Sequence, residues 1–145
     1  MRSGQAILRG VAVVTAVGGF VMDLNRTHMF NPQWTPHAKF HDAQTIVLGA
    51  LLGGSSLGLL VRQAPSPQVR APALAAVLSA FFWIALELSF LFPGARGLEA
   101  EVPSLVPRIR GVWINERFAS VLMLLCIAVG YLLERGAARD SSARS

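Results

Sequence analysis

The chain is poor in charged residues and nearly devoid of lysine and cysteine. Charged residues make up 14% of its 145 residues, whereas roughly a quarter is usual in a soluble domain. Lys39 is the only lysine, so arginine supplies nearly all of the basic residues behind the net charge of +5. Cys126 is the only cysteine, which excludes an internal disulfide. With a mean hydropathy of +0.50, the composition favours a single membrane domain over a soluble one.

A high isoelectric point invites a nucleic-acid interpretation, but the basic residues form no stripe and no patch interleaved with aromatic residues. They lie mostly at the ends of apolar runs, where they would meet lipid headgroups. We therefore predict a lipid bilayer as a partner and no nucleic acid.

Four stretches are apolar and long enough to cross a bilayer, which needs roughly 20 residues of helix. In the first of them, Arg9 must extend its side chain toward the headgroups. The fourth can start as early as Gly111. The stretches cover residues 5–24, 43–61, 71–92 and 118–133.

The predicted fold is all-α, an integral membrane bundle of four transmembrane helices over residues 1–135. Residues 136–145 are rich in Ala, Arg and Ser and are predicted to form a disordered cytoplasmic tail. The first stretch has an alternative interpretation as a cleaved signal peptide, because Arg2 and Arg9 accompany a short apolar run. No A-x-A-like cleavage pattern follows that run, which favours the helix.

Orientation follows from the basic residues of the short loops. With the N-terminus inside, seven basic residues are cytoplasmic and six are outside. This small excess predicts cytoplasmic termini, in a bacterial inner (plasma) membrane.

All three histidines lie between the first two apolar stretches or at the start of the second. Thr35 and Pro36 are typical of a helix start, with Thr35 as the N-cap and Pro36 at the first helical position. His37 and His41 then share one helix face, and Gln44 continues it.

The predicted topology brings polar residues of three helices to one depth. Glu87 lies about 7.5 Å below the outer end of the third helix, and Asn115 and Glu116 lie about 6 Å inside the fourth. His41 lies about one turn into the second helix. An ionisable residue among apolar neighbours is costly in a membrane unless it faces a polar interior. We therefore predict a shared polar layer in the outer leaflet.

Histidine and carboxylate groups buried at one level suit proton transfer, because burial and neighbouring charges shift their pKa values. The residues predicted to carry the chemistry are Glu87, His41, Glu116, Asn115 and His37. Those predicted to contact the substrate are Trp83, Asp23, Asn25, His28 and Gln44. Structural alternatives remain, since Glu116 can complement a helix dipole, and Asp23 and Asn25 are common turn residues.

A metal site is a competing hypothesis, because His37 and His41 are spaced as two ligands of one helix. The remaining ligands would come from Asp23, His28 or Glu87. However, the H-E-x-x-H pattern is absent, and Lys39 stands between the two histidines. We predict no bound metal and no cofactor.

The second stretch contains two overlapping small-xxx-small patterns, Gly49/Gly53 and Gly54/Gly58. Such patterns allow close approach of helix backbones. They predict tight packing inside the bundle and also suit self-association between two copies of the chain.

The run Asn31-Pro32-Gln33-Trp34-Thr35-Pro36-His37-Ala38-Lys39-Phe40-His41 resembles a motif of an uncharacterised family of small four-helix membrane proteins. A looser similarity, in residue types and approximate placement, is to the sterol-isomerase-like four-helix fold. Proteins of that fold use His and Glu side chains on lipophilic substrates. The resemblance implies a four-helix fold and assigns no role to individual residues.

The leading prediction is a membrane-embedded enzyme that performs acid–base chemistry on a lipophilic small molecule, by isomerisation, cyclisation or epoxide opening. No phosphate loop, dinucleotide fingerprint or nucleophile elbow is present. The first alternative is a non-enzymatic binding or accessory subunit of the membrane, and the second is a small proton-coupled exporter.

Overall fold

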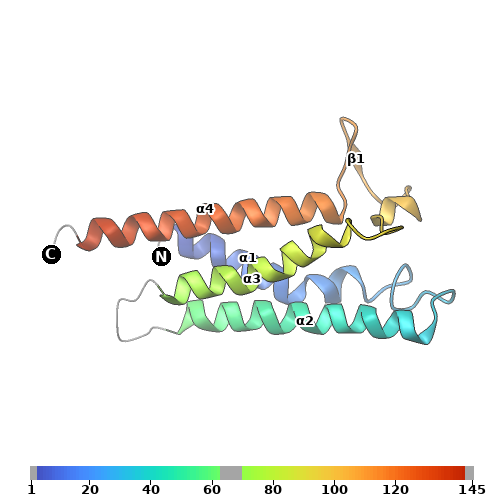
Figure 1. The fold of residues 1–145 in the computed structure, drawn as a ribbon, viewed down its shortest axis with the longest axis horizontal. Coiled ribbons are helices and arrows are strands. Elements are labelled where there is room, and N and C mark those ends of the chain that lie inside the picture. Colours follow the sequence, from blue (N-terminus) through green and yellow to red (C-terminus); the bar gives the residue numbers. More distant parts are fainter. Residues whose placement is uncertain (1–2, 63–69, 143–145) are drawn as a thin grey trace.

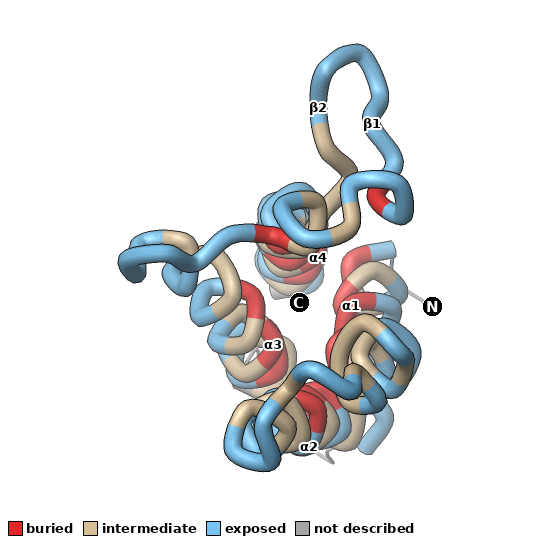
Figure 2. The backbone as a smooth tube through the Cα atoms, turned by 90° about the vertical axis from the view of Figure 1, so that its right-hand side faces the viewer, coloured by how far each residue is buried: buried red, intermediate tan, exposed pale blue. Residues whose placement is uncertain are grey.

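The computed structural model describes residues 3–62 and 70–142. Within them, four α-helices follow one another as an antiparallel bundle, with both ends of the chain at the same end of it (Figure 1). Each helix packs against the next, and α4 closes the ring against α1 (Figure 2). The helices are α1 (Ser3–Met22), α2 (Pro36–Val61), α3 (Arg70–Ser89) and α4 (Glu116–Ser142). The predicted four-helix fold is thus confirmed.

The start of α2 is the one that the sequence predicts. The Thr35 side chain accepts a hydrogen bond from the Ala38 amide at 3.2 Å, and Pro36 occupies the first helical position. This bond satisfies one of the free amides at a helix start. The predicted N-cap is confirmed.

The fourth helix differs from the prediction at both of its ends. Helix α4 begins at Glu116 and not at Gly111, because Asn115 caps it by accepting a hydrogen bond from the Phe118 amide at 3.1 Å. It continues to Ser142, whereas the sequence predicted a disordered tail from residue 136. Ala and Arg are strong helix formers, so the composition of this tail also permits a helix.

A short hairpin and a 3₁₀ turn fill the connection between α3 and α4. Strands β1 (Arg108–Ile109) and β2 (Val112–Trp113) pair antiparallel, after the turn η1 (Leu98–Ala100). The two residues of the hairpin loop, Arg110 and Gly111, both have positive φ, as a type I′ turn requires. The hairpin projects away from the bundle (Figure 2).

The bundle carries its apolar side chains on the outside. Large aliphatic and aromatic residues are exposed along all four helices, with Val21 71% and Leu51 63% exposed. The largest fully buried side chains are instead the hydroxyl-bearing Thr15, Ser56 and Ser120. A soluble bundle would bury the large apolar residues. The four helices are long and apolar enough to cross a membrane, and this distribution fits a membrane protein.

The buried hydroxyl groups join the helices to one another. Trp83 is buried and its indole nitrogen donates to Thr15 Oγ1 at 2.9 Å, which links α3 to α1. Ser79 Oγ donates to Ser56 Oγ at 3.1 Å, and Ser56 donates to the Ala75 carbonyl at 3.0 Å. Such bonds hold apolar helices together where water is absent. They give Trp83, predicted to contact substrate, a packing role.

The two glycine pairs of α2 face different surroundings. A Cβ on Gly49 would lie 3.0 Å from the Thr15 carbonyl oxygen, and one on Gly53 would lie 2.6 Å from the Ala12 carbonyl oxygen. A Cβ on Gly54 or Gly58 would meet no atom of the described residues within 4 Å. Gly49 and Gly53 therefore bring α2 close to α1, while Gly54 and Gly58 lie on the outer face.

Arg9 points to a helix end, and its predicted extension toward the headgroups stays a prediction. Its guanidinium donates to the Leu60 carbonyl at 2.6 Å, near the C-terminus of α2. Gln5 donates to the same carbonyl, and its own amide donates to Glu134 Oε1 at 3.0 Å. Unpaired carbonyls and the helix dipole attract a cation to a C-terminus and a carboxylate to an N-terminus. These contacts join α1, α2 and α4 near the chain termini.

Candidate functional site

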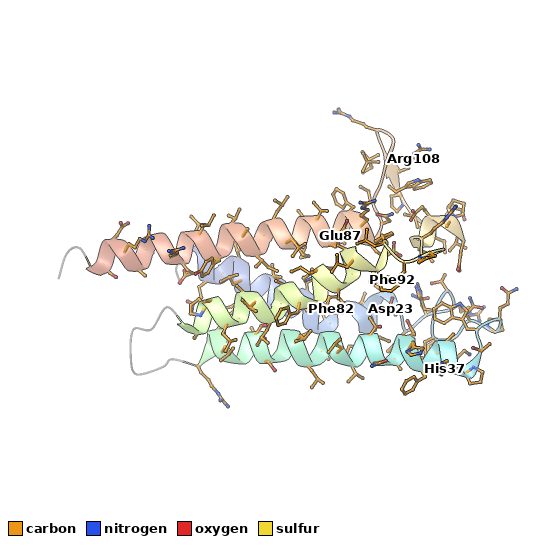
Figure 3. The ribbon with its side chains drawn as sticks, in the orientation of Figure 1. Asp23, His37, Phe82, Glu87, Phe92 and Arg108 are labelled. Atoms are coloured by element: carbon orange, nitrogen blue, oxygen red, sulfur yellow. The ribbon has the colours of Figure 1, made fainter. Side chains whose placement is uncertain are left out.

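Titratable residues concentrate at the end of the bundle opposite the chain termini. Figure 3 shows Asp23 and Glu87 toward this end, with His37 at the start of α2. Asp23 directly follows α1, and His28 lies in the loop to α2. The other charged groups come from the start of α2, the end of α3 and the start of α4.

Asp23 and His28 form the central pair of the site. Asp23 Oδ1 lies 4.0 Å from His28 Nε2, and both side chains are largely shielded from solvent. The loop is held by backbone bonds, since the Asp23 carbonyl accepts from the amides of Asn25 and Met29. The His28 ring also packs edge-on against Trp34, with ring centroids 5.4 Å apart. The pair is thus positioned by a compact turn.

The hydrogen bonds of the loop define the tautomer of neutral His28. Asn25 Oδ1 accepts from the Thr27 amide at 2.8 Å and from Thr27 Oγ1 at 2.6 Å. The single hydroxyl proton of Thr27 is then used, so Thr27 Oγ1 must accept from His28 Nδ1, which lies 2.8 Å away. Neutral imidazole carries one N–H. Its unprotonated Nε2 therefore faces Asp23, as a proton-sharing pair requires.

Burial raises the pKa of Asp23 from its ordinary value of 3.8 to about 6. His28 opposes this shift, while the carboxylates of Asp42 and Glu116 add to it. Removing a carboxylate from water disfavours its charged form, and neighbouring negative charge does the same. A carboxyl group with a pKa near 6 can both take and give a proton close to neutral pH.

Asp42 is a site residue that the sequence prediction missed. It lies on α2, four residues before the buried Ile46 and in line with Gly49 and Gly53. Its Oδ2 atom is buried and has no hydrogen-bond partner among the described residues. Its carboxylate is within electrostatic reach of Asp23 and His28. The glycine spacing, which identifies the packed face of α2, could have found it. We call Asp23, His28, Asp42 and Glu116 the carboxylate–imidazole cluster.

His41 does not point into the bundle, so its predicted place in the shared layer is wrong. It is exposed, and its ring nitrogen Nε2 lies 3.1 Å from His37 Nε2, with Nδ1 3.3 Å from Gln44 Oε1. His41 precedes Ile46 by five residues, which places it about 140° around the helix from that buried residue. The predicted common face of His37, His41 and Gln44 does form, but on the outside of α2.

Glu87 faces α4, and both of its carboxylate oxygens are engaged. Oε1 accepts from Arg117 Nε at 3.0 Å, and Oε2 accepts from Ser120 Oγ at 2.6 Å. Ser120 is fully buried. An acidic residue late in α3 therefore has a structural reason, because it joins α3 to the first turns of α4.

Asn115 and Glu116 anchor the loop that precedes α4. Asn115 Nδ2 donates to Glu99 Oε2 at 2.9 Å, in addition to its capping role. Both oxygens of Glu116 accept from the Leu98 amide, at 3.1 and 3.3 Å. Asn25 is a turn residue, whose side chain bonds to the Met22 carbonyl and to Thr27. Among Asn115, Glu116 and Asn25, only Glu116 carries a charge that acts on Asp23.

Among the described residues, no group of three or more His, Cys, Asp or Glu side chains is placed to hold a metal ion. His37 and His41 face each other, but the proposed further ligands lie elsewhere, with Asp23 beside His28 and Glu87 beside Arg117. The absence of a metal and of a cofactor stays a prediction.

The raised pKa of Asp23 predicts a pH-dependent stability. Because the folded state binds this proton more tightly than the unfolded state, the contribution is complete below about pH 4 and is lost as the pH rises through about 6. We expect the melting temperature in detergent to fall between these values by more in the parent than in Asp23→Asn. Equal pH profiles of the two proteins would contradict a raised pKa at Asp23.

We expect Glu87→Gln to lower stability by roughly 1 kcal/mol, because it removes an ion pair and weakens a bond to a carboxylate. Thermal unfolding in detergent should show a loss of a few degrees. Glu101→Gln is the control, since Glu101 is exposed and its side chain has no hydrogen bond or ion pair with another described residue. A Glu87 variant as stable as this control would argue against the structural role.

The apolar exterior and the internally bonded hydroxyl groups define the class, a four-helix bundle that fits a membrane protein. The chain belongs to the family of unknown function DUF6640, whose model matches residues 7–145. This agrees with the predicted membership of an uncharacterised family. Neither a curated protein nor a solved structure gives a significant match to the chain.

Proposed function

We propose that the chain is a membrane-embedded enzyme that transfers protons on a lipophilic small molecule, with Asp23 and His28 as its acid–base pair. The proposal rests on the position of His28 Nε2. This nitrogen lies 4.0 Å from Asp23 Oδ1 and is unprotonated in the neutral tautomer. A proton on this pair can reside on either partner. For a direct hydrogen bond, these two atoms must move about 1 Å closer together.

Isomerisation is the simplest reaction for such a pair. The ionised Asp23 carboxylate removes a proton from one carbon of the substrate, and the electron pair of that C–H bond shifts a double bond. The abstracted proton exchanges with solvent while Asp23 or His28 holds it. The pair then returns a proton to another carbon, so no co-reactant is consumed and D₂O supplies the label. Cyclisation and epoxide opening begin with proton donation from the same pair. In each case a group with a pKa near the working pH is most effective.

The remaining features of the proposal concern location and substrate. Four helices of sufficient length and apolarity support insertion into a bilayer, which we propose to be the bacterial inner membrane with both termini cytoplasmic. The apolar outer faces of the helices that carry the cluster would bring a lipophilic substrate to it from the lipid phase. Asp42 Oδ2, which has no hydrogen-bond partner in the described part of the chain, is suited to accept a hydrogen bond from a polar group of that substrate.

The test is an exchange experiment that detects turnover whichever product forms. The purified protein in lipid vesicles is incubated in D₂O with lipophilic alkenes, ketones and epoxides. Mass spectrometry then detects deuterium uptake into alkenes and ketones, and added water or ring-opened products from epoxides. We expect at least one class to react faster than with empty vesicles. A full panel without turnover would contradict the enzyme proposal.

The alternative is an accessory subunit whose polar groups fix the helix ends. The contacts of Glu87 with Arg117 and Ser120, and of Glu116 with Leu98, support it. This alternative predicts that the chain has no catalytic activity and that substitution of Asp23 changes only its stability.

A further inference from the structure

A groove runs along the outer face of α2, away from the carboxylate–imidazole cluster. Its volume is about 570 Å³, within the roughly 300–1,000 Å³ usual for ligand sites. Gly54 and Gly58 leave it open, because no atom from residues 3–62 or 70–142 lies within 4 Å of where their Cβ atoms would be. The residues that line it are Ala50, Leu51, Gly54, Ser55, Gly58, Leu59 and Arg62.

The length of the groove corresponds to one leaflet of a bilayer. Ala50, Gly54, Gly58 and Arg62 recur every four residues and so follow one face of α2. From Ala50 to Arg62 the helical rise is about 18 Å, slightly more than half of a hydrocarbon core about 30 Å thick. The groove therefore runs from near the middle of the proposed membrane to its surface.

Among the described residues that line the groove, Arg62 is the only charged one, and it lies at the end of the groove. It is exposed, and its guanidinium makes no hydrogen bond or ion pair among the described residues. Helix α2 ends at Val61, with Arg62 as its C-cap, so this cation lies where the apolar helix stops. An apolar groove with one cation at its surface end is complementary to a molecule with a long apolar chain and an anionic head.

We propose that this groove binds an anionic phospholipid, with an acyl chain along Ala50, Gly54 and Gly58 and the headgroup phosphate at Arg62. A second copy of the chain is the competing occupant, since small residues suit helix pairs. In a symmetric parallel pair, however, the two Arg62 side chains would meet at the same level and repel each other. A phosphate at this position is attracted. The inference rests on the bilayer location in the proposed function.

Native mass spectrometry of the detergent-purified chain, titrated with phosphatidylglycerol or phosphatidylcholine, tests the assignment. We expect tighter binding of phosphatidylglycerol. Arg62→Gln should weaken that binding roughly fivefold, the effect of one basic residue at a membrane surface. It should weaken phosphatidylcholine binding by less, because the choline group offsets the charge of the phosphate. Gly54→Leu should weaken the binding of both lipids. The matched controls are Arg139→Gln and Gly10→Leu, which alter exposed residues outside the groove and should leave the binding unchanged.

Three results would overturn the groove assignment by itself, and a fourth would overturn it together with the proposed function. The parent protein could bind both lipids equally, or Arg139→Gln could weaken binding as much as Arg62→Gln. Gly54→Leu could instead convert a dimer to a monomer in size-exclusion light scattering, which would assign the groove to a second copy.

Extraction of the chain from cell membranes by alkaline carbonate would contradict the bilayer location and, with it, both proposals. Retention in the membrane with equal lipid binding would reject the groove assignment alone.

Discussion

Asp23→Asn is expected to lower the rate of deuterium uptake or product formation by roughly 10²-fold or more. The amide cannot take or give the proton, although it keeps the size and much of the hydrogen-bonding capacity of the carboxyl group. The variant should remain folded, because the backbone hydrogen bonds of residue 23 do not involve its side chain. Its carbonyl accepts from the amides of Asn25 and Met29, and its amide donates to the Gly19 carbonyl. The rate is measured in vesicles, with the folded fraction determined on the same sample.

Two further variants test how specific this effect is. His28→Gln should also lower the rate, because it removes the imidazole nitrogen that faces Asp23. Asp140→Asn, which alters an exposed carboxylate in the last turns of α4, should retain the parental rate. If Asp23→Asn turned over substrate as fast as Asp140→Asn, Asp23 would not be the acid–base group.

Gly53→Ala is expected to destabilise the bundle more than the other substitutions named above. Its Cβ would lie 2.6 Å from the Ala12 carbonyl oxygen and against the backbone nitrogen of Ala16, and backbone atoms cannot move aside without separating α1 from α2. Overpacking of this kind costs up to roughly 3 kcal/mol, whereas alanine gains only about 1 kcal/mol over glycine in helix propensity. The steric term therefore dominates, and thermal unfolding in detergent should occur at a clearly lower temperature.

The neighbouring glycine provides a matched control for this prediction. Gly54→Ala makes the same substitution one residue along the same helix, where the new Cβ meets nothing within 4 Å. We expect its stability to equal or slightly exceed that of the parent. Equal melting temperatures for Gly53→Ala and Gly54→Ala would show that α1 and α2 do not approach as closely as the structure describes.

Hydropathy and capping chemistry were sufficient to predict the helices. Long apolar runs and the Thr35-Pro36 helix start depend on local sequence, and the structure has both. The hairpin before α4 was missed, since two-residue strands are too short to produce an alternating pattern. The sequence does contain one cue for it, because Gly111 can adopt the positive φ that the turn needs.

The site was harder to predict, because a depth in the membrane does not define the direction of a side chain. Glu87 and His41 were placed in one layer by their distance from helix ends, yet His41 is exposed on the outside of α2. The next residue, Asp42, lies on the packed face instead. The contacts of other side chains depend on partners from other helices. Ser120 and Arg117 engage Glu87, and the Leu60 carbonyl attracts Arg9, contacts that the periodicity of one sequence does not encode.

The most direct test of the acid–base pair is the titration of Asp23 itself. The chain has only three aspartates, Asp23, Asp42 and Asp140, so ¹³C labelling of aspartate carboxyl groups gives few NMR signals, and Asp23→Asn assigns the one of interest. We predict a midpoint at about pH 6, which rises further in His28→Gln because His28 lowers the pKa of Asp23. A midpoint near the ordinary value of 3.8, or one that does not respond to His28→Gln, would contradict the pair.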